Sequence, residues 1–288
     1  MRRSATRWNA RPATGTWNPT PDIKVVRDHH AIAVIDADKS AGHLSSHKAM
    51  TLAIQKAKQY GTATVSVRNS SHCGALAYYT QMAADAGCIG FASTTAGRLM
   101  APFGGVEKII ALNPLSWAAP TNKPWSVDLD MATSMIAGSK LGMAIEKGEK
   151  IPLGWALDEH GQPTTDASAA LRGSMLAMGG TKGAMLALVV ELLVTALTGA
   201  AQGFEASSFF VDEGNRPRIG QAFIVVDPAA LAGSDAYFER VETLVAAMLD
   251  DGGVRLPGER RAKLAARAAA EGIAIPEALA QQLQALAA

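Results

Sequence analysis

The stretch TATVSVRNSSHCGALAYYTQMAADAGCIGFAST, residues 62–94, has the pattern of a strand, a helix and a second strand. Residues 62–68 alternate between apolar and polar side chains, as a half-buried strand does, and residues 88–94 form a second strand-like run. Between them, residues 74–87 have a helical pattern that ends at a glycine. The stretch therefore predicts a strand-helix-strand unit in an α/β protein, with His72 at its first corner.

The segments on either side of this unit continue the α/β pattern. Residues 45–61 predict a helix with Ser45 or Ser46 as N-cap and with Met50, Ile54 and Ala57 on one face. Further strands are predicted at residues 108–112, 115–119 and 125–129 and in a hairpin over 209–226, and further helices at 234–249, 257–271 and from 276 onward. Two prolines, Pro257 and Pro276, are expected in the first turns of their helices.

Residues 184–201 form a long apolar run, AMLALVVELLVTALTGAA, which approaches the length that spans a bilayer. Glu191 lies at the centre of the run and Gly199 ends it. An ionisable residue at that position is costly in lipid, so the run predicts a buried core helix rather than a membrane span.

The amino-acid composition excludes several classes of binding partner. The 288 residues carry 27 basic and 26 acidic side chains, a net charge of +1, and no basic patch that would favour nucleic acid. The two cysteines, Cys73 and Cys88, lack the spacing of a metal site and indicate reduced thiols in the cytoplasm. The N-terminus lacks the apolar stretch of a signal peptide. We therefore expect a cytoplasmic protein that binds no nucleic acid, membrane or metal.

The corner at His72 has two interpretations. A strand-to-helix corner exposes unpaired N–H groups and the positive end of the helix dipole, which favour an anionic ligand, and Gly74 and Ala75 allow close approach. The alternative is a histidine that only hydrogen-bonds a neighbouring loop. For Cys73, a packed thiol is favoured over a nucleophile.

Five other segments rich in Gly, Pro or small polar residues lie at the edges of apolar runs, where ligands commonly bind. They are MAPFGG (100–105), LNPLSWAAP (112–120), LDMATS (129–134), GGTKG (179–183) and LPGERR (256–261). No G-x-G-x-x-G or G-x-x-x-x-G-K-[ST] pattern is present, so neither a Rossmann fold nor a P-loop is supported.

In this order the segments resemble the malate/L-lactate dehydrogenase family, which includes ureidoglycolate and sulfolactate dehydrogenases and Δ1-piperideine-2-carboxylate reductases. The resemblance runs from about Asn18 to the C-terminus. It implies NAD or NADP as cofactor, a non-Rossmann α/β domain with a mixed sheet flanked by a helical domain, and a homodimer. By this resemblance, residues 1–22 are a remnant of an N-terminal helical region, 23–228 are the NAD(P)-binding α/β domain and 229–288 are a C-terminal helical region.

The resemblance also assigns roles to individual residues. His72 matches the histidine beside the nicotinamide, which serves as acid and base in the ureidoglycolate branch, a role that suits an imidazole near neutral pH. Lys140 falls where the hydroxy-acid branches carry lysine and imine reductases tend to carry aspartate, which favours an oxyacid. The remaining implied cofactor contacts are Gly74, Ala75, Leu76, Ala96, Asp130, Met131, Ala132, Thr133, Ser134, Lys182, Gly258, Glu259 and Arg260, and His72 is one as well.

The chain departs from the family pattern at three places. Ala111 and Leu112 replace the usual Gly-Thr before Asn-Pro, so Leu112 and Asn113 are expected at the substrate without identifying it. The segment after TKG lacks the usual second glycine. Family members also carry an N-terminal Ser-His-Gly motif followed by an arginine, and this chain is expected to begin at or just beyond it. Arg2 is then either the carboxylate-binding arginine or part of a basic terminus without a role.

The function expected from the resemblance is hydride transfer between nicotinamide and a small 2-hydroxy or 2-oxo acid, such as malate, lactate, ureidoglycolate or sulfolactate. The alternatives are a cyclic-imine reductase and a non-catalytic cofactor-binding paralogue. Arg260 and Arg261 could hold the 2′-phosphate of NADP, whereas Glu259 beside them favours the ribose hydroxyl of NAD.

Overall fold

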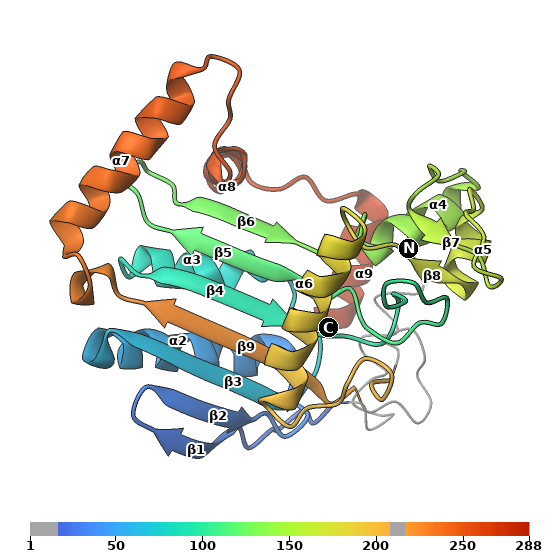
Figure 1. The fold of residues 1–288 in the computed structure, drawn as a ribbon, viewed down its shortest axis with the longest axis horizontal. Helices are drawn as coiled ribbons and strands as arrows, with labels where there is room; N and C mark the ends of the chain where they lie inside the picture. The colour runs from blue at the N-terminus through green and yellow to red at the C-terminus, as the bar shows by residue number, and fades with distance from the viewer. Residues whose placement is uncertain (1–16, 208–216, 288) are drawn as a thin grey trace.

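The computed structural model describes residues 17–207 and 217–287. Seven strands form one mixed sheet in the order β1-β2-β3-β9-β4-β5-β6, in which only the pair β2 and β3 is parallel (Figure 1). The strands are β1 (Lys24–His29), β2 (Ile32–Asp36), β3 (Thr62–Ser70), β4 (Ile89–Thr94), β5 (Leu115–Ala119), β6 (Val127–Met131) and β9 (Ile219–Val226). The predicted α/β class with a mixed sheet is confirmed.

The predicted strand-helix-strand unit is present as β3, α3 (Ala77–Asp85) and β4. The two strands are not neighbours, because β9 lies between them and is antiparallel to both. β9 is the second half of the predicted hairpin, and residues 208–216 of its first half lie outside the described residues. The prediction missed β1 and β2 altogether.

The helix before the unit is α2 (Gly42–Tyr60), which begins earlier than predicted. Its N-cap is Ala41, and no side chain caps it, so the prediction of Ser45 or Ser46 as N-cap is wrong. Both serines are buried inside the helix, where the Ser45 hydroxyl lies 3.0 Å from that of Ser70 on β3. The hydroxyls therefore join the helix to the sheet instead of ending the helix.

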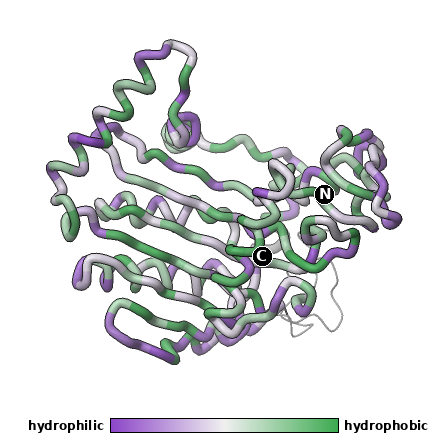
Figure 2. The backbone as a smooth tube through the Cα atoms, in the orientation of Figure 1, coloured by the Kyte–Doolittle hydropathy of each residue, from purple (hydrophilic) through white to green (hydrophobic). Residues whose placement is uncertain are grey.

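The main core lies between the sheet and the helices α2 and α3, which cover one of its faces (Figure 1). Its largest side chains include Met50, Tyr79 and Phe223, and the rings of Tyr79 and Phe223 meet edge to face. Figure 2 shows hydrophobic residues running along the central strands above these helices. Most of its apolar side chains come from α2, β3, β9 and the neighbouring strands, and Ala37, Cys73 and Cys88 join it from loops.

A second, smaller core lies beside the sheet. It includes Met100, Ile110, Leu141 and Met175 and is surrounded by α4 (Gly138–Lys147), α5 (Ala167–Arg172), β7 (Ala156–Leu157) and β8 (Ser174–Met175). The predicted strand at 108–112 is wrong, because this segment makes only an isolated bridge from Ile110 to Met100. Its apolar residues serve the second core rather than a sheet.

The apolar run at 184–201 becomes α6 (Thr181–Glu191) and a π-helical turn, η1 (Leu192–Ala196). One side packs inward, but Met185 and Val189 are each 52% exposed, so the predicted buried core helix is buried on one side alone. α6 crosses the sheet face opposite α2 and α3 (Figure 1), and one helix leaves its own outer side uncovered. Over the described ranges, no helix combines the length and hydropathy that a bilayer crossing requires.

The C-terminal helices are present as predicted: α7 (Ser234–Asp250), α8 (Glu259–Glu271) and α9 (Glu277–Ala287). A short 3-10 turn, η2 (Pro228–Ala230), precedes them. Pro257 and Pro276 lie just before α8 and α9 rather than inside their first turns. The division of the chain at residues 22 and 228 stays a prediction.

Candidate functional site

His72 lies at the corner between β3 and α3, and its ring is held by the turn that follows it. The backbone N–H of Gly74 donates to Nδ1 of His72 at 2.8 Å, so the neutral imidazole carries its proton on Nε2. Gly74 has φ +76°, a conformation that glycine adopts without strain. The turn thus sets both the orientation and the tautomer of His72.

The N-terminus of α2 packs against the same corner. A Cβ added at Gly42 would stand 2.2 Å from the carbonyl oxygen of Ser71 and 2.6 Å from that of His72. His43, the next residue, brings its ring centroid to 6.5 Å from that of His72. The sequence reading missed His43, because no motif links it to residues thirty positions away.

The expected anion site at the start of α3 is already used by the protein. Oδ2 of Asp130, at the end of β6, accepts the backbone N–H of Ala77 at 2.8 Å. A carboxylate at a helix N-terminus satisfies an unpaired donor and complements the dipole. The bond brings together the HCGAL and DMATS segments, two regions that the resemblance assigns to the cofactor.

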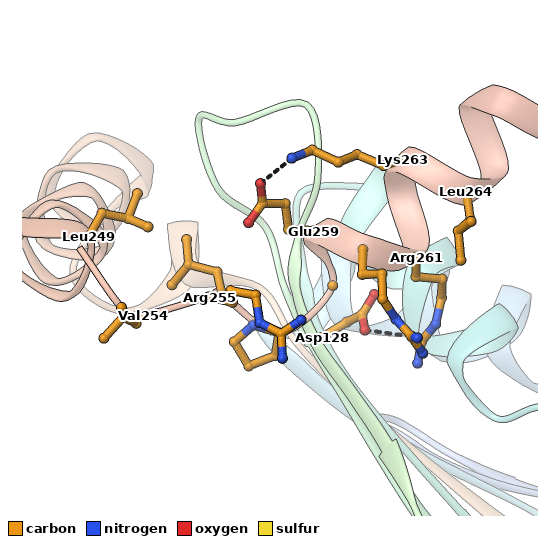
Figure 3. Close-up of a pocket in the computed structure, with 13 residues that line it drawn as sticks. Asp128, Leu249, Val254, Arg255, Glu259, Arg261, Lys263 and Leu264 are labelled. Atoms are coloured by element: carbon orange, nitrogen blue, oxygen red, sulfur yellow. Dashed lines mark hydrogen bonds and ion pairs between the residues drawn. The ribbon is translucent and has the colours of Figure 1, made fainter. Parts of the chain in front are cut away.

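Beyond Asp130, the same face of β6 leads to a cavity. Asp128 and Asp130 alternate along the strand, and Ser126 lies just before it. The Ser126 hydroxyl bonds Gln81 of α3, and Asp128 pairs with Arg261 of α8. The cavity, of about 1100 Å³, lies between the end of α7 and the start of α8 (Figure 3). Asp130, which holds the start of α3, and Asp128, which lines the cavity, therefore lie two residues apart on β6.

Cationic side chains line the cavity. Arg261 pairs with the buried Asp128 at 2.5 Å and Lys263 pairs with Glu259 at 2.6 Å, as Figure 3 shows. Arg255 and Arg260 also line it, and neither forms an ion pair with any residue that the structure describes. Burial raises the pKa of Asp128, and the Arg261 guanidinium opposes that rise.

Gly258 shapes the floor of this cavity. It has φ +97°, and a Cβ there would stand 2.3 Å from the carbonyl oxygen of Ser126. Only a glycine lets the Pro257–Glu259 turn lie this close to the edge of β6. The turn at Gly258 and Glu259, which the resemblance assigns to the cofactor, is therefore fixed against Asp128. Arg261 pairs with that residue, whereas Arg260 does not.

The expected substrate residues form a separate group. Thr133 donates both its backbone N–H and its hydroxyl to the carbonyl oxygen of Leu112, at 3.0 and 2.9 Å. A Cβ at Gly138 would lie 3.3 Å from Leu112, so the first turn of α4, with exposed Lys140, stands over this residue. Asn113 is fully buried and faces the interior.

The other expected residues have varied surroundings. Ala75, Met131 and Lys182 are exposed, whereas Ala132 and Ala96, the latter just beyond β4, are half-buried. Leu76 and Ser134 are buried, and the Ser134 hydroxyl donates to the carbonyl oxygen of Ile136. Among the described residues, no hydrogen bond or ion pair joins Lys182 to the other expected site residues, and Arg2 lies outside those residues.

Cys73 is not a nucleophile in this arrangement. It is buried, and burial raises the pKa of its thiol to about 12, so almost no thiolate forms near neutral pH. Across residues 17–207 and 217–287, no cluster of three or more His, Cys, Asp or Glu side chains could hold a metal ion.

Comparison with known proteins gives a family and several relatives. A family model described as malate/L-lactate dehydrogenase matches residues 6–284. The chain is 39% identical over 271 residues to the (2R)-3-sulfolactate dehydrogenase (NADP(+)) of Chromohalobacter salexigens, covering 92% of this chain and 80% of the relative.

Two solved structures have the same fold. The sulfolactate dehydrogenase of Methanocaldococcus jannaschii superimposes with a TM-score of 0.85 at 37% identity, over 96% of this chain and 81% of that one. The delta1-piperideine-2-carboxylate reductase of Pseudomonas syringae pvar. tomato gives 0.90 at 31% identity, over 97% and 84%. The similar proteins thus include a hydroxy-acid dehydrogenase and a cyclic-imine reductase.

Proposed function

The chain belongs to the malate/L-lactate dehydrogenase family of NAD(P)-dependent dehydrogenases and reductases, and from this premise we propose that its substrate is a small 2-hydroxy or 2-oxo acid. The observation that supports this most is on β6, where Asp130 holds the start of α3, five residues after His72, and Asp128 lines a cationic cavity. For the acid, the proposal assigns the positive charge to Lys140, which is exposed in the first turn of α4.

The residues present fit a nicotinamide dinucleotide. Gly258, which packs against Ser126, lines the cavity without a side chain and so leaves room for the cofactor. Arg255 and Arg260 provide positive charge for its phosphate groups. When bound, the nicotinamide gives hydride to C2 of the acid or takes it away. Within this chain, Asp130 holds the start of α3 in place and His72 exchanges the proton of the substrate oxygen.

Proton exchange at His72 requires the corner to move. When the ring is protonated, both nitrogens carry hydrogen, and the Gly74 N–H can no longer donate to Nδ1. The peptide of Gly74 must then turn away. Its positive φ and missing Cβ give this residue the backbone freedom for that movement.

The proposed function is tested by following NAD(P)H absorbance with malate, lactate, sulfolactate, ureidoglycolate and Δ1-piperideine-2-carboxylate. We expect turnover of at least one acid. Faster turnover of the cyclic imine would support the second candidate, which the likeness to the Pseudomonas syringae reductase favours. Cofactor binding without any turnover would contradict both and indicate a non-catalytic paralogue.

We predict that Arg260→Ala weakens NADPH binding about tenfold or more and leaves NADH nearly unchanged. A guanidinium holds a 2′-phosphate by charge-assisted hydrogen bonds, and Arg260 is the arginine of α8 in this cavity that Asp128 does not already use. Fluorescence titration measures both dissociation constants. Arg267→Ala, on the same helix and paired with Glu271, is the control. An unchanged NADPH to NADH ratio in Arg260→Ala would refute the phosphate contact.

We predict that Lys140→Gln raises KM for the acid about tenfold or more while the cofactor dissociation constant stays the same. A hydrogen bond from a charged donor contributes about 1.5–3 kcal/mol, which corresponds to this change. Lys147→Gln, in the last turn of the same helix, is the matched control. Equal losses of acid and cofactor binding in Lys140→Gln would remove Lys140 from the substrate site.

We also propose a cytoplasmic homodimer. Both cysteines are free and buried, which suits a reducing compartment. The outer side of α6 carries exposed apolar residues, including Met185, Leu188 and Val189, of the kind found at protein contacts.

A further inference from the structure

Glu191 is a buried carboxylate at the end of α6, in the middle of the apolar run 184–201. The residue is 3% exposed. Its Oε1 accepts the backbone N–H of Gly203 at 2.6 Å, and its Oε2 accepts Nδ2 of Asn113 at 2.7 Å and the Thr95 hydroxyl at 3.5 Å. Within residues 17–207 and 217–287, no lysine or arginine forms an ion pair with it. Hydrogen bonds alone therefore offset the cost of burying this carboxylate.

The three donors come from three separate segments. Thr95 follows the end of β4, Asn113 precedes β5, and Gly203 lies in the loop after η1. An apolar side chain at position 191 would suit α6 equally well as a helix residue, so the helix itself does not need a carboxylate there. The Glu191 carboxylate instead joins these three segments, because each donates a hydrogen bond to it.

The segments it binds carry the expected site residues. Asn113 adopts φ +40°, and its Nδ2 also donates to the carbonyl oxygen of Ala187, so the amide fixes an unusual turn directly after Leu112. On the other side, Thr95 immediately precedes Ala96. Glu191 thus holds Asn113, directly after Leu112, and Thr95, directly before Ala96, at one carboxylate.

The network continues to the His72 corner. The backbone N–H of Thr95 donates to the carbonyl oxygen of Gly220 on β9. The next residue, Gln221, is fully buried and donates from Nε2 to the carbonyl oxygen of Ser71 at 3.0 Å. A path of hydrogen bonds and adjacent residues therefore leads from Glu191 through β9 to the residue before His72.

We propose that Glu191 is a positioning residue, whose carboxylate sets the placement of the Leu112–Asn113 turn relative to Ala96 and the His72 corner. This inference rests on the proposed function, because it takes those residues as the nicotinamide and substrate site. Glu191 itself contacts neither ligand. It acts through Asn113 and Thr95.

Glu191→Gln tests this with almost no change in shape. If the new amide keeps its oxygen towards Gly203, its NH₂ group faces Nδ2 of Asn113, and two donors meet. We expect kcat/KM for the acid to fall about tenfold or more, mainly through kcat. The affinity for adenosine 2′,5′-bisphosphate, a probe of the adenosine end alone, should change less than twofold.

Thr198→Val is the matched control. Thr198 is buried seven residues further along, and among the described residues its hydroxyl bonds within its own segment, to the carbonyl oxygens of Val194 and Thr195 and the N–H of Ala200. This variant should lose stability without the loss of kcat. If both variants reduce kcat in proportion to their loss of melting temperature, Glu191 is merely structural and the proposal is wrong.

Exchanging the carboxylate and the amide between positions 191 and 113 gives a second test. In Glu191→Gln/Asn113→Asp, the new amide can donate to the new carboxylate, although the bond to the Ala187 carbonyl is lost. We expect higher kcat/KM in the double variant than the product of the single losses predicts. Simple additivity would overturn the proposed coupling.

Hydrogen exchange distinguishes this proposal from the proposed function. Glu191→Gln, but not Thr198→Val, should increase amide exchange in residues 95–113 at a temperature well below the transition of either variant. That increase is expected even if no acid is turned over, in which case only the proposed function fails. Unchanged exchange in an active enzyme would overturn the positioning role instead.

Discussion

His72→Asn is expected to lower kcat/KM for the acid by about a hundredfold or more, since a positioned general acid or base contributes at least that much. Asparagine is the informative replacement at this corner. Its side-chain oxygen can take the place of Nδ1 and accept the Gly74 N–H, so the turn keeps its bond. What the substitution removes is the second ring nitrogen and the ability to hold an extra proton.

The loss should fall on the chemical step. We expect the dissociation constant of NADPH, measured by fluorescence, to change little, and the melting temperature to stay within a few degrees. His160→Asn serves as control, because His160 lies in an exposed loop of the second core region. A kcat/KM for His72→Asn within about threefold of the unmodified protein would end the acid/base assignment.

Gly42→Ala is expected to cost about 2–3 kcal/mol of unfolding free energy, as overpacking does in tight interiors, and to reduce activity as well. The added Cβ would stand 2.2 Å from the Ser71 carbonyl oxygen, and both neighbours are backbone atoms of the corner. Because these neighbours are backbone atoms, no change of side-chain rotamer can relieve the clash. The helix must shift, and the corner that carries His72 shifts with it.

Thermal denaturation with parallel kinetics measures this effect. For a chain of this size, the cost corresponds to a decrease in melting temperature of roughly 5–10 °C. Gly142→Ala is the matched control, because Gly142 lies in α4 with nothing within 4 Å of the added Cβ. Alanine there should be neutral or stabilising, since it favours the helix. Equal melting temperatures for Gly42→Ala and the unmodified protein would show that the corner is loosely packed.

The local sequence pattern was sufficient to predict those helices and strands whose own residues carry a clear period and clear end signals. β3, α3, β4, β5 and the three C-terminal helices were predicted because period and breaker residues are local properties. Local pattern failed where a segment is shaped by distant partners. The run at 108–112 has strand-like residues, yet it packs into the second core as a loop.

The site divides in the same way. The sequence by itself determined the family and the short segments expected at the cofactor, because those motifs are contiguous and occur in a specific order. Only the tertiary structure decided what each residue contacts. It places Asp130 on the first N–H of α3, commits Arg261 to Asp128, and buries Asn113 against Glu191. These contacts join residues separated by 53, 133 and 78 positions. No local window contains both partners, so their pairing follows only from how the sheet orders its strands.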